Sequence, residues 1–240
     1  MVDEPANGLV ALGQRVTNAE LVVASGGNLA ARLPDRDAVL VTPRGWALDG
    51  LDPAALATVG FDGRQLSGAF APTTELALHL AALRSRSDAV VSLHLHPPMA
   101  SLLDAAGLPI RRITTDHAYY LRRLAAVPFI QPGSAELARA VATKLADADI
   151  VLLKNHGCVI VADSFDVGFS RAINLEAAAL ATYRAHLLGT VVAECPPEFL
   201  AEVAAQEAAG IVYGKSGSGF TSGRRVGMPE HLTSAEDYAE

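Results

Sequence analysis

The chain has 240 residues, of which 50% are hydrophobic and 19% are charged, a composition typical of a globular protein with ample material for a core. Its formal net charge of −7 and scattered basic residues argue against nucleic-acid binding and favour a small-molecule partner. No apolar run approaches the ~20 residues of a membrane-spanning helix. Two cysteines and a start without signal-peptide features predict a cytoplasmic protein that does not enter a membrane.

Helices and short strands alternate in the first part of the chain. Residues 6–24 have apolar side chains at helical spacing and predict a helix, which ends at a glycine loop, residues 25–27. Residues 38–42 predict a short buried strand. Residues 57–61, followed by the Asp62-Gly63 turn, predict one arm of a hairpin. The fold should therefore mix sheet and helix.

The middle of the chain repeats this alternation. A helix with leucines on one face follows residues 72–74, and a strand over residues 88–93 leads into the histidine-proline segment 94–98. Residues 132–134 resemble a helix cap and precede a helix with its apolar residues in register. Residues 150–153 predict a further buried strand, which leads into a second histidine segment.

The last part of the chain is mainly helical. Residues 158–161 predict a strand, residues 164–188 a long alanine-rich helix closed by a glycine, and residues 197–209 a final helix. No change in composition marks a linker, so we expect one domain over residues 1–213. A polar tail over residues 214–240 follows it.

Three histidines predict a metal site. His94 and His96 are two residues apart at the end of a strand, so their side chains should point to the same face. His156 follows another strand and precedes Gly157, which allows close approach. Any one of them alone is more simply a hydrogen-bonded histidine, but together they match catalytic zinc sites with one open position. We expect one divalent ion per subunit, zinc in the first place, with manganese and cobalt as alternatives.

The helix that follows residues 72–74 begins with groups suited to catalysis and anion binding. Glu75 lies at its start, where the helix dipole favours a carboxylate that can act as an acid/base group beside a metal. Thr73 and Thr74 offer hydroxyl and N–H groups that can hold an anion. Taken one at a time, these residues are better interpreted as a helix-end charge and as ordinary capping.

Five short motifs follow one another along the chain: Gly26-Gly27-Asn28, Thr42-Pro43-Arg44-Gly45, Thr73-Thr74-Glu75, His94-Leu95-His96-Pro97-Pro98 and Asn155-His156-Gly157. In this order they resemble the class II aldolase and adducin family, and within it the L-fuculose-phosphate aldolase branch. The resemblance covers nearly the whole chain. It implies a three-layer α/β/α sandwich with a central mixed, mainly antiparallel sheet, a zinc ion, and a homotetramer with active sites at subunit interfaces.

The resemblance also implies roles for individual residues in aldol cleavage of a phosphorylated ketose through a metal-stabilised enediolate. Glu75 matches the acid/base residue, and Tyr119 lies in the stretch where a neighbouring subunit provides the tyrosine that protonates the aldehyde. The positions that match the metal ligands are His94, His96 and His156, and those that match the phosphate site are Asn28, Gly45, Thr73 and Thr74.

Arg44 departs from the family pattern, which has serine or threonine there, and Trp46 follows closely. An arginine fork binds phosphate or carboxylate, and a tryptophan could support a flat aromatic substrate. A metal-dependent decarboxylase of an aromatic or sugar acid is therefore an alternative to the aldolase. The simpler alternative is a surface arginine beside a packed tryptophan.

Two further functions stay open at this point. The related ribulose-phosphate epimerases carry aspartate at the position of Glu75, so glutamate favours aldol cleavage over 4-epimerisation. A non-catalytic, adducin-like scaffold is the other possibility, and the intact histidines argue against it.

Three other features suggest chemistry but have simpler explanations. Lys154 could form a Schiff base, but a structural ion pair beside a metal site is the more plausible role. Cys158 begins an apolar run and should be buried rather than a ligand. Residues 210–216 resemble a phosphate-binding loop but have one residue too few between the glycines.

Overall fold

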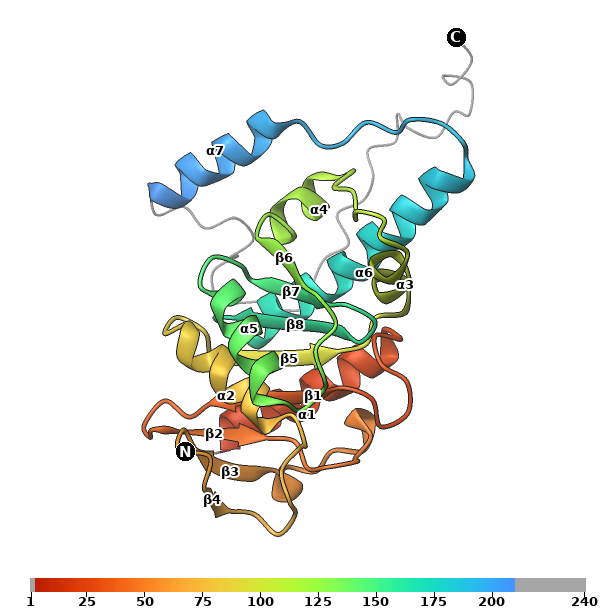
Figure 1. Cartoon of the computed structure of the whole chain (residues 1–240). Coiled ribbons are helices and arrows are strands. Elements are labelled where there is room, and N and C mark those ends of the chain that lie inside the picture. The colour runs from red at the N-terminus through yellow and green to blue at the C-terminus, as the bar shows by residue number, and fades with distance from the viewer. Residues whose placement is uncertain (1–2, 210–240) are drawn as a thin grey trace, which may run out of the picture. The chain divides into compact units, whose positions relative to one another are not determined.

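The computed structural model of the chain describes residues 3–209 (Figure 1). The strands are β1 (Asn28–Arg32), β2 (Ala38–Val41), β3 (Ala57–Gly60), β4 (Gln65–Ser67), β5 (Val91–Leu95), β6 (Leu124–Val127), β7 (Ile150–Leu153) and β8 (Gly157–Ala162). The helices are α1 (Asp3–Asn18), α2 (Leu76–Ser85), α3 (Pro98–Ala106), α4 (Thr115–Tyr120), α5 (Ala135–Leu145), α6 (Phe165–Leu187) and α7 (Pro197–Ala208), with 3₁₀ turns η1 (Leu48–Gly50) and η2 (Pro53–Ala55).

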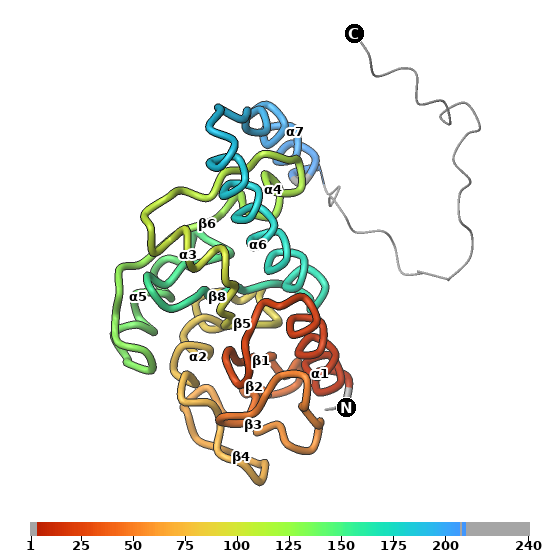
Figure 2. Tube along the Cα trace, turned by 90° about the vertical axis from the view of Figure 1, so that its right-hand side faces the viewer, coloured from red at the N-terminus to blue at the C-terminus, as the bar shows by residue number. Residues whose placement is uncertain are grey.

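The eight strands form one sheet in the order β4-β3-β2-β1-β5-β8-β7-β6. The β6–β7 pair is parallel and every other pair is antiparallel. One apolar core joins the sheet to α1, α3 and α6, and a second joins its other face to α2 and α5. Figure 2 shows α2 and α5 on one side of the strands and α1 and α6 on the other. The three-layer α/β/α fold with a mixed, mainly antiparallel sheet is thereby confirmed.

The chain divides into two compact units after Ala201, within α7. The first unit contains the whole sheet and every predicted site residue. The predicted boundary at residue 213 and the glycine-lysine segment 210–216 lie outside the described residues. Among the described helices, none is both long and apolar enough to span a bilayer.

Serine caps mark the starts of two predicted helices. Ser134 precedes α5, and its hydroxyl accepts a hydrogen bond from the Leu137 N–H at 3.1 Å. Ser164 precedes α6 and accepts from the Val167 N–H at 3.3 Å. Each hydroxyl satisfies one of the N–H groups that a helix start leaves without a partner, so a serine at this position marks the boundary.

The first helix differs from the predicted range of residues 6–24. It ends at Asn18, because Glu20 adopts a left-handed backbone conformation with φ of 57° and the chain reverses. The Leu21 N–H then donates to the Val16 carbonyl at 3.0 Å, a bond typical of a Schellman-type helix end. This reversal buries Leu21 completely in the core under α1.

Two elements near the predicted histidine site were not expected from the sequence. Strand β1 is alanine-rich, and its residues are buried on both faces between β2 and β5. Helix α3 begins right after the histidine-proline segment, and the Glu176 carboxylate of α6 accepts its Met99 and Ala100 N–H groups at 2.8 and 2.9 Å. Strand β5 also runs to Leu95, so His94 lies inside the strand rather than after residue 93.

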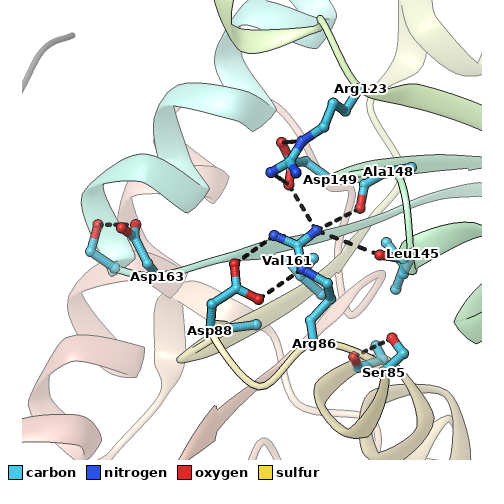
Figure 3. Close-up of polar contacts among 12 residues, drawn as sticks. Ser85, Arg86, Asp88, Arg123, Leu145, Ala148, Asp149, Val161 and Asp163 are labelled. Atoms are coloured by element: carbon cyan, nitrogen blue, oxygen red, sulfur yellow. Dashed lines mark hydrogen bonds and ion pairs between the residues drawn. The ribbon is translucent and has the colours of Figure 1, made fainter. Parts of the chain in front are cut away.

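A cluster of charged side chains lies where β6 and β7 begin (Figure 3). Asp149, which is 1% exposed, precedes β7 and contacts three arginines from different elements. Arg86 at the end of α2 lies 3.0 Å from its carboxylate, Arg123 before β6 lies at 2.6 Å, and Arg171 of α6 at 2.9 Å. Arg86 also binds Asp88 at 2.7 Å, which supplies a second negative charge. The side chain of Asp149 therefore links both helical layers to the sheet.

Replacing Asp149 by Asn should destabilise the protein by about 3–5 kcal/mol, because Arg86 and Arg171 would stay buried without their shared counter-ion. Urea denaturation measures this loss. The matched control is Asp166→Asn, since the Asp166 side chain is 86% exposed in its pair with Arg15 and the expected loss is about 0–1 kcal/mol. Equal, small losses in both variants would contradict a structural role for the cluster.

Candidate metal centre

The strand register brings the three predicted histidines to one end of the sheet. His94 lies in β5, His96 follows the end of that strand, and His156 lies in the turn between β7 and β8. Strands β5 and β8 are antiparallel neighbours, with Leu95 opposite Cys158. The ring centroids of the three imidazoles are 4.7 to 5.3 Å apart. Their candidate ligand atoms all lie within 4.8 Å of one another.

The nitrogen atoms are arranged as a cation would require. The Nδ1 atom of His94 lies 3.0 Å from the Cys158 carbonyl oxygen, which accepts its proton, so Nε2 would offer its lone pair to a bound cation. That Nε2 lies 3.0 Å from Nε2 of His96. Two nitrogens bound tetrahedrally to one zinc ion at about 2.0–2.1 Å would lie roughly 3.3 Å apart. The donor set therefore fits one shared divalent ion.

Glu75 brings a carboxylate to the same point. It is the N-cap residue of α2 and is 8% exposed. Its Oε2 atom lies 2.9 Å from His94 Nε2 and accepts a hydrogen bond from Asn28 Nδ2 at 3.2 Å. Its Oε1 atom lies 3.7 Å from His156 Nε2 and is a buried oxygen without a hydrogen bond among the described residues. One carboxylate oxygen is thus held in place while the other is available.

The protonation states suit a metal site. Burial raises the pKa of Glu75, but the hydrogen bond from His94 and the contacts with Asn28 and His156 outweigh it and lower the pKa to about 2. Burial, followed by the neighbouring imidazoles, lowers the pKa of His96 to about 4. Burial also lowers the pKa of His156. At neutral pH the site therefore presents an ionised Glu75 carboxylate and neutral imidazoles at His96 and His156.

Glycines around the histidines leave room for the His96 ring. A Cβ atom on Gly157 would lie 2.6 Å from His96 Cδ2 and would also overlap the Leu95 carbonyl oxygen. A Cβ atom on Gly26 would lie 3.1 Å from His96 Nδ1. Gly27 adopts a left-handed conformation with φ of 77° beside the His94 carbonyl. Gly26 and Gly157 are therefore explained by the space that the His96 ring occupies, and Gly27 by its close approach to the main chain of β5.

The two loops predicted to bind an anion lie beside each other. Pro43 and Pro72 pair as an isolated antiparallel bridge, and the Arg44 N–H donates to the Ala71 carbonyl at 3.0 Å. The pairing brings the exposed Arg44 and Gly45 alongside the exposed Thr74. An anion could meet a guanidinium group, a hydroxyl and backbone N–H groups there.

The contacts of Thr73 and Trp46 instead stabilise the fold around the site. Thr73 is buried, and its hydroxyl accepts a hydrogen bond from the Glu75 N–H at 3.3 Å, as in a turn closed by a threonine side chain. Trp46 packs against the core and lies 4.9 Å from the Phe70 ring, centroid to centroid. These contacts favour packing over a stacking role for Trp46.

Asn28 lies deeper than its predicted role in phosphate binding requires. It is 8% exposed and lies opposite His94 across the β1–β5 pair. Its amide nitrogen donates to Glu75, and its Oδ1 atom is 2.7 Å from His79 Nε2. The structure thus brings Asn28 together with the catalytic candidate, and a contact with phosphate stays a prediction.

Tyr119 lies at the other end of the sheet from His156 of the same chain. Helix α4 ends just before β6, whose first residue, Leu124, pairs with Ile150. His156 follows the last residue of β7, which is Leu153. Because β6 and β7 are parallel, α4 and His156 lie at opposite strand ends. Tyr119 could therefore reach such a site only in another subunit.

Sequence reasoning overlooked His79, which is fully buried on α2. Its Nδ1 atom lies 2.9 Å from Ser92 Oγ, and its Nε2 atom contacts Asn28. The available signal was the spacing of Glu75 and His79, because residues four apart share a face of a helix. A polar Ser92 two residues before His94 in an apolar strand was a second signal.

The side chains of Lys154 and Cys158 do not take part in this site. The Lys154 ammonium donates a hydrogen bond to the Asp104 carbonyl of α3, so its role is structural, although the partner is a main-chain oxygen and not the expected carboxylate. Cys158 is fully buried, and burial raises the pKa of its thiol to about 12. A neutral thiol is a poor metal ligand.

Comparisons with known proteins show the family of the chain. The family model described as "Class II Aldolase and Adducin N-terminal domain" matches residues 7–183. L-fuculose phosphate aldolase of Methanocaldococcus jannaschii is 31% identical over 146 residues, which cover 61% of this chain and 77% of the relative. 3-oxo-tetronate 4-phosphate decarboxylase of Escherichia coli is 34% identical over 157 residues, which cover 63% and 73%. The crystal structure of YgbL from Klebsiella pneumoniae superposes with a TM-score of 0.77 at 25% identity, over 84% of this chain and 98% of that one.

The fold and the site together define a metal-dependent carbon–carbon lyase of the aldolase type. The chain belongs to the class II aldolase and adducin family.

Replacing Gly157 by Ala should force the His96 ring or the β5 backbone to move, at a cost of about 1–3 kcal/mol in stability. Cobalt affinity should fall about 10-fold or more, because the ligand geometry is disturbed. Urea denaturation and a cobalt absorption titration measure the two effects. Gly50→Ala is the control, since its Cβ would meet no atom within 4 Å. Unchanged cobalt affinity in Gly157→Ala would contradict the proposed packing.

Proposed function

We propose that the protein cleaves a phosphorylated ketose, of the fuculose-1-phosphate type, into dihydroxyacetone phosphate and an aldehyde. The observation that carries this proposal is the convergence of three imidazoles and the Glu75 carboxylate at one point. Similarity to L-fuculose phosphate aldolase supports it.

His94, His96 and His156 are the proposed ligands of one divalent ion, with zinc as the first choice and manganese or cobalt as alternatives. When bound, the ion would supply Lewis-acid polarisation of the ketose carbonyl and the neighbouring oxygen. The Cys158 carbonyl fixes the tautomer of His94, so that Nε2 faces the site.

Glu75 is the proposed acid/base residue. Its Oε2 atom is engaged by Asn28, whereas Oε1 has no hydrogen bond among the described residues. In the direction of aldol addition, Oε1 would take the proton from the carbon beside the carbonyl. In the direction of cleavage, the hydroxyl that becomes the aldehyde would pass its proton to Oε1, directly or through water, as the carbon–carbon bond breaks. Oε1 would then deliver a proton to the carbon beside the carbonyl, which leaves Glu75 ionised again.

The substrate's terminal phosphate would lie between the loops joined at Pro43 and Pro72. Arg44, Gly45 and Thr74 are exposed there and offer charged, backbone and hydroxyl donors. Thr73 would contribute to phosphate binding indirectly, because its hydroxyl holds the turn that carries Thr74.

Tyr119 would act on the aldehyde in a neighbouring subunit's site, because it lies far from its own chain's histidines along β6 and β7. The proposal therefore includes active sites at subunit interfaces. The proposed assembly is a homotetramer, and its proposed location is the cytoplasm.

Decarboxylation of a phosphorylated sugar acid is the second candidate. The exposed Arg44 beside the site favours it, because a guanidinium group binds carboxylate as well as phosphate. A relative named for this activity is 34% identical. The same carboxylate and imidazoles would serve, with carbon dioxide leaving in place of an aldehyde.

Replacing His94 by Ala should reduce the metal content to near zero and abolish turnover, because two nitrogens cannot replace the three-ligand site. Metal analysis of the purified protein and a coupled assay for dihydroxyacetone phosphate measure both. His186→Ala is the matched control, since His186 is exposed on α6. A protein without affinity for zinc, manganese or cobalt would refute the proposal.

A substrate panel separates the two candidates. Fuculose-1-phosphate and ribulose-1-phosphate test aldol cleavage, and 3-oxo sugar acid phosphates and hydroxy-aromatic acids test release of carbon dioxide. We expect release of dihydroxyacetone phosphate from the ketose phosphates. Release of carbon dioxide alone would replace the aldolase with the decarboxylase.

A further inference from the structure

A continuous chain of buried hydrogen bonds runs from Ser92 to Glu75. Ser92 Oγ lies 2.9 Å from His79 Nδ1, and His79 Nε2 lies 2.7 Å from Asn28 Oδ1. Asn28 Nδ2 then donates to Glu75 Oε2 at 3.2 Å. Ser92 and His79 are 0% exposed, and Asn28 and Glu75 are 8% exposed, so water cannot readily replace a lost partner.

These four groups come together because α2 lies over the β1–β5 pair. Glu75 and His79 are four residues apart and face the sheet from the same side of α2. Below them, Asn28 pairs with His94, and Ser92 pairs with Ala30. Because Ala30 carries only a methyl group, the His79 ring has room above the two strands.

The Glu75 carboxylate, at the end of this series of hydrogen bonds, determines the direction of each of them. An ionised carboxylate only accepts, so Asn28 must present its N–H group to Glu75 and its carbonyl oxygen to His79. A carbonyl oxygen also only accepts, so His79 must carry its proton on Nε2. Its Nδ1 atom is then an acceptor for the Ser92 hydroxyl. Burial and the nearby His94 lower the pKa of His79 to about 3, in keeping with this neutral form.

We propose that His79 is a positioning residue for the acid/base carboxylate. By donating its Nε2–H to Asn28, it fixes the orientation of the amide, which in turn holds Glu75 Oε2 and leaves Oε1 to face the substrate. With the proton on Nδ1 instead, the Nε2 lone pair would favour a rotated amide, and an amide oxygen would face the Glu75 carboxylate. The role of Glu75 in this inference rests on the proposed function, whereas the state of His79 does not.

Two substitutions of similar polarity separate positioning from simple packing. In His79→Gln the amide N–H can reach the place of Nε2 and still donate to Asn28. In His79→Asn the shorter amide reaches only the place of Nδ1, so contact with Ser92 is kept and contact with Asn28 is lost. A packing role predicts that both variants lose activity only as far as they lose folded protein.

The experiment compares kcat, KM, zinc content and unfolding free energy for the full-length protein and both variants. We expect kcat of His79→Asn to fall about 10- to 100-fold, with KM and zinc content within about twofold of the parent. We expect kcat of His79→Gln to stay within about threefold. Equal loss in both variants, or loss that follows the folded fraction, would overturn the positioning role.

A second measurement tests His79 without turnover. Nitrogen-15 NMR of the histidine side chains in the metal-free protein should show the Nε2–H tautomer for His79, identified by the signal that His79→Gln removes. Crystal structures of the two variants should show Glu75 Oε2 in place in His79→Gln and displaced in His79→Asn. The Nδ1–H tautomer, or an unmoved Glu75, would refute the inference even if the substrate proposal holds. Absence of turnover on the whole panel, with the expected tautomer and displacement, would refute only the substrate proposal.

Discussion

The pairing of β5 with its two neighbours is the constraint on which the site depends. Strand β1 places Asn28 opposite His94, and strand β8 places Cys158 opposite Leu95 and turns back at His156. Side chains alternate between the faces of a strand, so a slip of one residue would turn His94 toward the α1 and α6 layer. The buried apolar residues of β5 on that layer oppose such a slip, because they would then face the other core.

The second requirement is that α2 lies over this register with its N-terminus at the histidines. A carboxylate at the start of a helix is stabilised by the helix dipole, which helps to keep Glu75 ionised although it is buried. One turn later His79 lies over β1 and β5, where it contacts Asn28 and Ser92. Negative charge and neutral imidazoles thus converge where two secondary structures meet, and neither element alone would create the site.

Features governed by neighbouring residues were predictable, and features governed by distant partners were not. Ser134 and Ser164 mark helix starts because a cap acts over three residues, and alternation of histidine with an apolar residue indicated the predicted ligand pair at the end of β5. Strand β1 is recognisable only from the strands on both of its sides, since alanines have little strand preference of their own. The cap of α3 comes from Glu176, far along the chain, so no local pattern announces that helix.

The site divides into a buried part and an exposed part that can change independently. His94, Glu75 and Asn28 are held by the sheet and by close polar contacts with one another, so a substitution there disturbs several partners at once. Arg44 and Thr74 lie on exposed loops, where a new side chain disturbs little. One relative of similar identity bears the name of an aldolase and another that of a decarboxylase, and such a division of the proposed site would allow both activities on one fold. The loops would select the anion and the leaving group, while the buried part would move the same proton.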